Sequence, residues 1–145
     1  MPHQLAAYAI VIMRKDNKIL LLQRNESASF APNHYSLIGG ALEKDESFRE
    51  AAVREVFEEI GIKIKVDDLK FVHTFQRRKV AHELVVCVFE CTTWQGEPYN
   101  KELKKHTALA WFSEEALPKK MIPAHRNALT LIKQHLFYSE HQDPS

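Results

Sequence analysis

The feature that most restricts the fold is the stretch from residue 47 to residue 60, which no glycine or proline interrupts. Apolar side chains recur there every four residues, at Phe48, Ala52, Val56 and Ile60. This spacing predicts a helix of about four turns with one buried face. Ser47 and Glu50 have the spacing of a capping box at its start, and Gly61 stands where a helix-ending glycine belongs.

Short apolar runs rich in β-branched residues surround this helix and predict strands. They cover residues 6–13, 19–23, 35–38, 69–76, 83–91 and 108–112. A second apolar stripe predicts a helix over residues 124–137. The order of these elements predicts an α/β (α+β) fold, with a mixed β-sheet between helices on its two faces. We expect one domain over residues 1–145, with a core from about residue 5 to 137 and a frayed tail at 138–145.

Charge and composition exclude several other classes. A net charge of +1 argues against a large nucleic-acid footprint, which would make the domain strongly basic. Two basic clusters, residues 77–79 and 101–105, are interpreted as solvated loops. The apolar part of the N-terminus, residues 5–13, is too short to span a bilayer and follows no basic segment. Cys87 and Cys91 should share one strand face as unpaired thiols. We therefore expect a cytoplasmic protein without membrane contact.

Three acids of the predicted helix converge within about one turn, because residues three and four apart share a helix face. They are Glu55, Glu58 and Glu59. Like charges this close repel one another unless a cation neutralises them. Magnesium prefers such carboxylate oxygens, together with water and substrate phosphates. The cluster is therefore a candidate metal site, although a solvated acidic helix face is the competing interpretation.

Arg54 precedes these acids, and Glu46 lies eight residues before it. A guanidinium group can bind a carboxylate with two hydrogen bonds and fix its orientation. We infer that Arg54 orients one of the acids and that Glu46 is its partner, in support of the metal ligands. Gly39 and Gly40 permit close backbone approach, so the Gly40 carbonyl is a further candidate ligand.

The whole segment resembles the Nudix box, G-x5-E-x7-R-E-U-x-E-E-x-G-U, where U is a bulky aliphatic residue. All nine fixed positions match, as Gly40, Glu46, Arg54, Glu55, Val56, Glu58, Glu59, Gly61 and Ile62. A chance match in a chain of this length has a probability on the order of one in 10⁸, given residue usage of a few per cent per type. This excludes the solvated acidic face. Asp45 stands where many members have glycine, and aspartate tolerates turn conformations well.

The resemblance implies an α/β/α sandwich and hydrolysis of a nucleoside diphosphate linked to another group, with Mg²⁺ or Mn²⁺ as cofactor. It implies that Arg54, Glu55, Glu58 and Glu59 are the catalytic residues. The three glutamates and the Gly40 carbonyl would hold the metal, and Glu46 would support Arg54. The family varies in its general base, so that role stays open among the box glutamates and three acids outside the box, Glu83, Glu97 and Glu102.

Candidate substrate contacts lie outside the box. Arg24, at the end of a predicted strand, could contact phosphate, and Glu83 could contact substrate. Tyr35, Phe30 and Trp111 could stack on a base. For each of them a surface or packing role is the alternative. The loops at residues 25–34, 92–105 and 118–125 should determine the choice of substrate.

The predicted partner is a small nucleotide. Residues 110–118 resemble nucleotide-pool enzymes of the MutT type, which favours hydrolysis of a nucleoside triphosphate to the monophosphate and pyrophosphate. Alternatives are an ADP-ribose or nucleotide-sugar hydrolase, a catalytically silent nucleotide-binding module and, against the near-neutral charge, an RNA 5′-pyrophosphohydrolase. The sequence leaves open whether the chain forms a homodimer.

Overall fold

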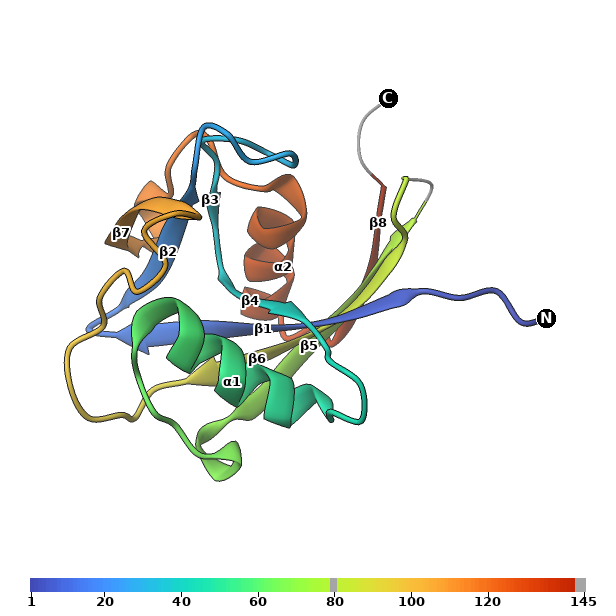
Figure 1. The fold of residues 1–145 in the computed structure, drawn as a ribbon, viewed down its shortest axis with the longest axis horizontal. Coiled ribbons are helices and arrows are strands. Elements are labelled where there is room, and N and C mark those ends of the chain that lie inside the picture. Colours follow the sequence, from blue (N-terminus) through green and yellow to red (C-terminus); the bar gives the residue numbers. More distant parts are fainter. Residues whose placement is uncertain (79–80, 143–145) are drawn as a thin grey trace.

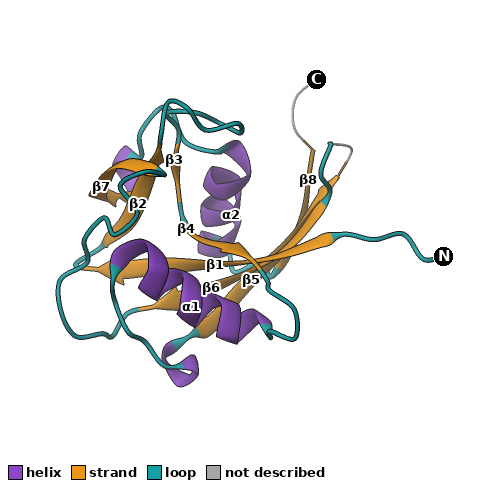
Figure 2. Ribbon diagram, in the orientation of Figure 1, coloured by secondary structure: helices purple, strands orange, loops and turns teal. Residues whose placement is uncertain are grey.

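A computed structural model describes residues 1–78 and 81–142, and Figure 1 shows a mixed β-sheet with a helix on each side. Figure 2 distinguishes the strands, the helices and the loops that connect them. The strands are β1 (Ala6–Lys15), β2 (Lys18–Arg24), β3 (Tyr35–Ser36), β4 (Ile38–Ala41), β5 (Lys70–Arg78), β6 (Leu84–Cys91), β7 (His106–Ser113) and β8 (Tyr138–Gln142). The helices are α1 (Phe48–Ile60) and α2 (Pro123–Lys133), with short 3₁₀ turns at Val66–Asp68 and Glu114–Ala116.

β1 is the strand around which the sheet is organised. The strand order is β3-β2-β1-β6-β5-β8, with β4 also paired to β1 and β7 also paired to β2. The pairs β1–β6 and β5–β8 are parallel, and the other pairs are antiparallel. β1 and β2 form an antiparallel hairpin, with Arg14 opposite Ile19. The predicted mixed sheet is therefore confirmed.

Alternating residues of β1 enter two separate cores. Ala9, Val11 and Met13 pack with Val56 and the rest of the buried face of α1. Ile10 and Ile12 pack on the opposite side, with apolar residues of α2. A strand buried on both faces needs a continuous apolar run, and β1 has one. The sandwich of two helix layers around a sheet, implied by the resemblance, is confirmed (Figure 1).

The two glycines before the box acids lie in a strand. The predicted strand over residues 35–38 is interrupted at Leu37, and Ile38–Ala41 forms β4 beside β1. Gly39 is opposite Ile10, and Gly40 is opposite Ala9. A side chain on Gly39 would overlap the Ala9 carbonyl. Small residues thus let β4 lie close to β1, which brings the glycines next to α1.

The C-terminal end differs from its prediction. α2 ends at Lys133, and His135 has a positive φ of 59° that turns the chain away from the helix axis. Residues Tyr138–Gln142, expected to fray, instead form β8 along the edge of β5. The backbone gains hydrogen-bond partners there that water would otherwise provide. The buried His73 side chain also bonds the Leu136 carbonyl and the Ser139 hydroxyl, both at 2.8 Å. The remaining part of that tail, residues 143–145, lies outside the described residues.

Two expectations drawn from composition can be compared with the fold. Cys87 and Cys91 are free thiols on the α1-facing side of β6, as their spacing predicts. Within residues 1–78 and 81–142, no helix has the length and apolar character needed to cross a membrane.

Candidate active site

The acids are carried by a helix with well-defined ends. At the start of α1 the Ser47 hydroxyl accepts from the Glu50 backbone N–H at 3.0 Å, and the Glu50 carboxylate accepts from the Ser47 N–H at 2.9 Å. This is the predicted capping box. Gly61 ends the helix with a φ of 72°, as expected. Asp45, in the turn before the helix, has a φ of 65°, so it adopts the left-handed conformation that aspartate tolerates.

Arg54 and Glu46 form a two-hydrogen-bond pair across the turn that precedes the helix. Arg54 Nε donates to Glu46 Oε2 at 2.7 Å, and its Nη2 donates to Glu46 Oε1 at 2.9 Å. The same Nη2 also donates to the Ala41 carbonyl at 3.0 Å. The bond to Arg54 lowers the pKa of Glu46, and the bond to Glu46 raises the pKa of Arg54. Both groups therefore stay charged, and the guanidinium group is fixed in one orientation.

The third nitrogen of Arg54 is directed at the acid cluster. Nη1 donates to Glu55 at 2.9 Å and to Glu58 at 3.2 Å. Burial raises the pKa of Glu55, although Arg54 opposes this effect. A side-chain carbon on Gly40 would overlap the Glu55 carboxylate, so this acid lies directly against the strand backbone. A side chain at residue 40 would therefore displace the Glu55 carboxylate from this position.

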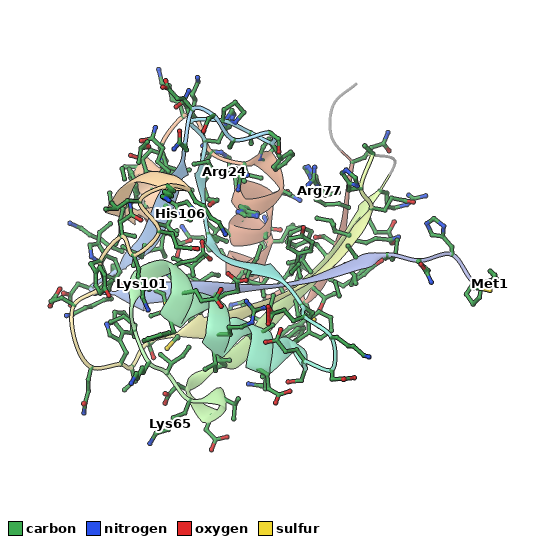
Figure 3. The ribbon with its side chains drawn as sticks, in the orientation of Figure 1. Met1, Arg24, Lys65, Arg77, Lys101 and His106 are labelled. Carbon is green, nitrogen blue, oxygen red and sulfur yellow. The ribbon has the colours of Figure 1, made fainter. Side chains whose placement is uncertain are left out.

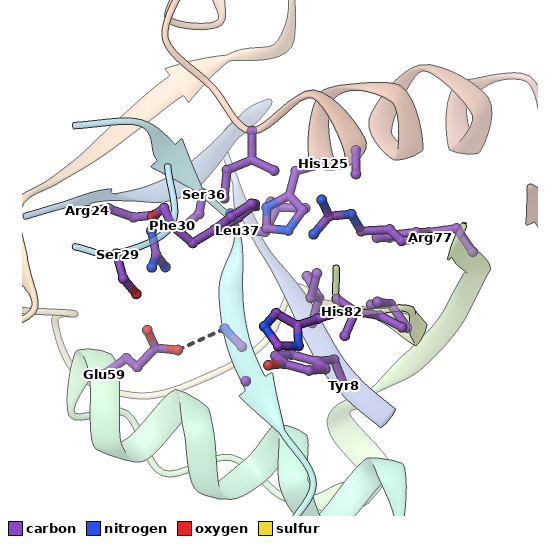
Figure 4. Close-up of a pocket in the computed structure, with 18 of the residues that line it drawn as sticks. Tyr8, Arg24, Ser29, Phe30, Ser36, Leu37, Glu59, Arg77, His82 and His125 are labelled. Atoms are coloured by element: carbon purple, nitrogen blue, oxygen red, sulfur yellow. Dashed lines mark hydrogen bonds between the residues drawn. The ribbon is translucent and has the colours of Figure 1, made fainter. Parts of the chain in front are cut away.

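Glu59 is the most enclosed of the three acids, at 5% exposed. Its Oε1 accepts a hydrogen bond of 2.8 Å from the Gly39 backbone N–H, drawn as the dashed line in Figure 4. Burial, and then repulsion from Glu55, raise the pKa of Glu59 well above its usual value. Removing a carboxylate from water without a cationic partner is costly. The ionised form of Glu59 is therefore disfavoured in the metal-free protein, and a nearby cation would stabilise it.

Two further side chains approach Glu59 from outside the box. Glu59, Glu102 and His106 each offer one ligand atom, and these atoms lie within 4.8 Å of one another. Burial lowers the pKa of His106, and the nearby Glu102 carboxylate opposes this effect. Of the three outside acids considered as a base, only Glu102 reaches the cluster. Sequence reasoning missed His106, because a single histidine at the end of a polar loop has no distinguishing pattern.

A cavity of about 580 Å³ opens beside Glu59, Gly39 and Gly40. Figure 4 shows Glu59 on one side of it, with Arg77 and His125 across the space. Apolar lining comes from β1, β6 and α2, and the loop at residues 25–34 contributes Ser29 and Phe30. A cavity of this size and composition is typical of small-molecule sites.

Cationic groups lie around the cavity. Figure 3 shows Arg24 and His106 close together, and these residues are paired across β2 and β7. Arg24 Nε donates to the Phe30 carbonyl at 2.7 Å. The guanidinium carbons of Arg24 and Arg77 lie 5.6 and 5.1 Å from the centre of the Phe30 ring. Residues 77–79 were expected to form a solvated loop, but Arg77 lines the cavity. Lys79 of the same cluster lies outside the described residues.

His125, near the start of α2, was also missed. Its Nδ1 accepts a 3.1 Å hydrogen bond from the Leu37 backbone N–H. Burial, with Arg77 and Arg24 nearby, lowers its pKa to about 3. The imidazole is therefore neutral near pH 7. Since Nδ1 accepts, the proton is on Nε2, which makes His125 a hydrogen-bond donor in the cavity wall.

Three predicted contacts lie elsewhere. The Tyr35 ring packs edge-on against Phe112, with centroids 5.0 Å apart, and so belongs to the core. Glu83 precedes β6, and its carboxylate lies 2.8 Å from His3 Nε2. Trp111 stacks on Trp94 beside Glu97, in a separate small hollow. Packing rather than base stacking explains the two aromatic residues, and neither Glu83 nor Glu97 lines the cavity beside Glu59.

The comparisons with known proteins identify the family. A family model described as the NUDIX domain matches residues 2–132. The chain belongs to the Nudix family. The CTP pyrophosphohydrolase of Escherichia coli is 35% identical over 78% of this chain and 80% of its own length. A solved MutT NUDIX hydrolase from Burkholderia pseudomallei has a TM-score of 0.81 at 27% identity, covering 88% of this chain and 98% of that one.

The relatives do not share one substrate. An NAD-capped RNA hydrolase of Chromobacterium violaceum is 31% identical over 81% of this chain, which spans 42% of that relative's length. Membership shows that this Nudix chain is a hydrolase acting on pyrophosphate bonds. Nudix hydrolases generally use a divalent metal, and the acids around Glu59 are consistent with such an ion. The group attached to the diphosphate needs a separate argument.

Proposed function

We propose that this Nudix hydrolase cleaves a nucleoside triphosphate to the monophosphate and pyrophosphate, with Mg²⁺ or Mn²⁺. The observation that carries the proposal is the position of Glu59. This buried acid belongs to the carboxylate face of α1 and also lines the cavity of about 580 Å³. A bound nucleotide would therefore have its phosphates beside the acids and its base in the apolar part of the cavity.

Glu55, Glu58, Glu59 and the Gly40 carbonyl would hold the metal. Two features of the chain fit this role. Burial raises the pKa of Glu55 and Glu59, so both would gain from a cation. The absence of a side chain at Gly40 keeps the backbone in direct contact with the Glu55 carboxylate. When bound, a divalent ion neutralises charge on phosphate oxygens and makes a bound water more acidic.

The protein's own groups provide positioning and charge. Arg54, held by Glu46, fixes the carboxylates of Glu55 and Glu58. Arg24 and Arg77 offer positive charge to a bound nucleotide from the cavity wall, with Arg77 on the side opposite Glu59. A glutamate of the cluster, or Glu102, would orient the attacking water and accept its proton. The role of general base remains open among these acids.

The substrate assignment rests on the cavity and on one relative. Phe30 presents an aromatic face beside two arginines, and His125 presents a donor to a carbonyl or ring nitrogen of a base. The similar protein from Escherichia coli is named for CTP. On these grounds we propose a nucleoside triphosphate as the substrate of this chain, without assigning the preferred base.

The test is a substrate panel of nucleoside triphosphates, ADP-ribose, a nucleotide sugar and a dinucleoside polyphosphate, each with Mg²⁺ and with Mn²⁺. Phosphorus NMR would identify the products. We expect monophosphate and pyrophosphate from at least one triphosphate, with kcat/KM at least about tenfold above the other classes. A higher value for ADP-ribose or a nucleotide sugar would overturn the substrate assignment alone. No turnover of any compound would favour a silent binding module.

A further inference from the structure

His106 is a buried imidazole whose side chain has no hydrogen bond among the described residues. It is the first residue of β7 and is 6% exposed. Its Nδ1 is buried and has no hydrogen-bond partner in the described part of the chain. Its Nε2 lies 3.4 Å from Glu59 Oε2, and these atoms do not form a recorded hydrogen bond. Neither ring nitrogen therefore has a recorded hydrogen bond within the described residues, and Nε2, which faces Glu59, is placed to bind a cation on that side.

The backbone holds His106 in this position. Asn100 Nδ2 donates to the His106 carbonyl at 2.7 Å, and the His106 N–H donates to the Glu102 carbonyl at 3.0 Å. The backbone of Lys101 also bonds the Glu59 carbonyl at 3.0 Å, which attaches the loop to the end of α1. The loop therefore presents Glu102 and His106 to Glu59 as one ordered unit.

The three side chains together have the composition of a metal site. One carboxylate oxygen from Glu59, one from Glu102 and one imidazole nitrogen lie within 4.8 Å of one another. Two carboxylate oxygens this close repel each other when both groups are ionised. A divalent cation between them would remove this repulsion and would give the imidazole a partner.

We propose that His106 is a nitrogen ligand which, with Glu59 and Glu102, completes a metal site selective for Mn²⁺ over Mg²⁺. The inference rests on the metal dependence in the proposed function, but not on the substrate. Mg²⁺ binds oxygen ligands almost exclusively, whereas an imidazole suits transition metals. A site with one imidazole nitrogen ligand beside its carboxylates should therefore prefer Mn²⁺ to Mg²⁺ more strongly than a site with oxygen ligands alone.

The alternative is that His106 only donates a hydrogen bond from Nε2 to Glu59 and so positions that acid. Both roles predict lower activity when His106 is replaced, so activity alone cannot separate them. A direct bond between manganese and an imidazole nitrogen has a spectroscopic signature that a positioning role lacks. Electron spin-echo envelope modulation of bound Mn²⁺ detects the coupled ¹⁴N nucleus.

The experiment compares Mn²⁺-loaded wild type, His106→Gln and, as a matched control, His34→Gln. His34 is a histidine whose Nδ1 pairs with the Pro32 carbonyl in the loop at residues 25–34. We expect ¹⁴N modulation in wild type and in His34→Gln, and its loss in His106→Gln. Mn²⁺ affinity should fall about tenfold in His106→Gln, and Mg²⁺ affinity by less than about threefold. Circular dichroism checks the fold, and His106→Asn replaces His106→Gln if that variant unfolds.

The outcomes separate the two proposals. Mn²⁺ bound without ¹⁴N modulation in wild type would overturn the role of His106 and leave the proposed hydrolysis intact. Equal loss of Mg²⁺ and Mn²⁺ affinity in His106→Gln would overturn the selectivity. Modulation that persists in His106→Gln would assign the nitrogen to another residue and overturn the proposal. If wild type shows ¹⁴N modulation but hydrolyses no triphosphate, the metal site is supported and the substrate assignment is overturned.

Discussion

One side of the cavity comes from a single helix and the strand before it, whereas the other side is assembled from distant segments. The acid side comprises Gly39, Gly40 and Glu59, which lines the cavity next to Glu55 and Glu58 of the same helix, all within 21 residues of sequence. The recognition side comprises Arg24, Phe30, Arg77 and His125, which come from β2, the loop after it, β5 and α2. The first arrangement is local in sequence and the second requires the complete fold. We expect substitutions on the two sides to affect different steps.

The largest effect should follow loss of a charge on the acid side. Glu58→Gln and Glu59→Gln should each lower kcat on the order of 10³-fold with the fold retained, because each removes a proposed metal ligand. Steady-state assays of triphosphate hydrolysis at saturating Mg²⁺ measure this. Glu97→Gln is the matched control, since Glu97 lies in a separate hollow and should change kcat less than about twofold. Nearly full activity in Glu59→Gln would contradict the assignment.

A smaller effect is expected at the support of the acids. Arg54→Lys keeps the charge but cannot bond Glu46, Glu55 and Glu58 together, so metal affinity should fall about 10- to 100-fold. In Glu46→Gln the metal affinity should fall less, because the glutamine amide oxygen can still accept a hydrogen bond from Arg54. Calorimetric titration with Mn²⁺ gives both values. The reverse order of effects would argue against Arg54 as the organising group.

On the recognition side we expect changes in KM. Arg24→Gln and Arg77→Gln should each raise KM for the triphosphate about tenfold and change kcat less than about threefold, because they remove binding interactions made before the reaction. The same assays measure both constants. A large fall in kcat without a change in KM would place these arginines in the chemical step and remove the contrast between the two sides.

The smallest effect concerns stability and pH. The pKa of Glu59 is raised by burial, so the folded protein holds this proton more tightly than the unfolded chain. Metal-free stability should therefore fall as pH rises from the ordinary value of 4.5 through the raised pKa. In Glu59→Gln this loss should be absent, and the metal-free Tm at pH 8 should be about 3 °C above that of wild type. Thermal melts in EDTA between pH 5 and 8 measure Tm for wild type and Glu59→Gln. Equal changes of Tm with pH in the two proteins would contradict the prediction.

The same contrast explains what the sequence could predict. The capped helix, its acids and the Arg54–Glu46 spacing depend on residues near one another in the chain, so local rules identify them. Arg77, His106 and His125 become cavity residues only when β5, β7 and α2 meet, and no local pattern marks them. Of the loops expected to determine substrate choice, the first supplies Phe30 and the third supplies His125.

Two further outcomes have physical causes of the same kind. The sequence leaves both base stacking and core packing open for Tyr35, and its packing partner Phe112 lies on a strand far along the chain, so only the fold distinguishes the two roles. The polar tail was expected to fray because its side chains bury little apolar surface. Its backbone instead pairs with β5, whose free edge is visible only in the folded sheet.

The most direct test of the central claim is metal removal and replacement in wild type and Glu58→Gln, with pyrophosphate release from the best triphosphate as the readout. The carboxylate face of α1 should make activity fully dependent on a divalent ion. EDTA should abolish release in wild type, and Mg²⁺ or Mn²⁺ in excess should restore it. Glu58→Gln should stay on the order of 10³-fold below wild type at every metal concentration. Pyrophosphate release that survives EDTA in wild type would contradict the claim.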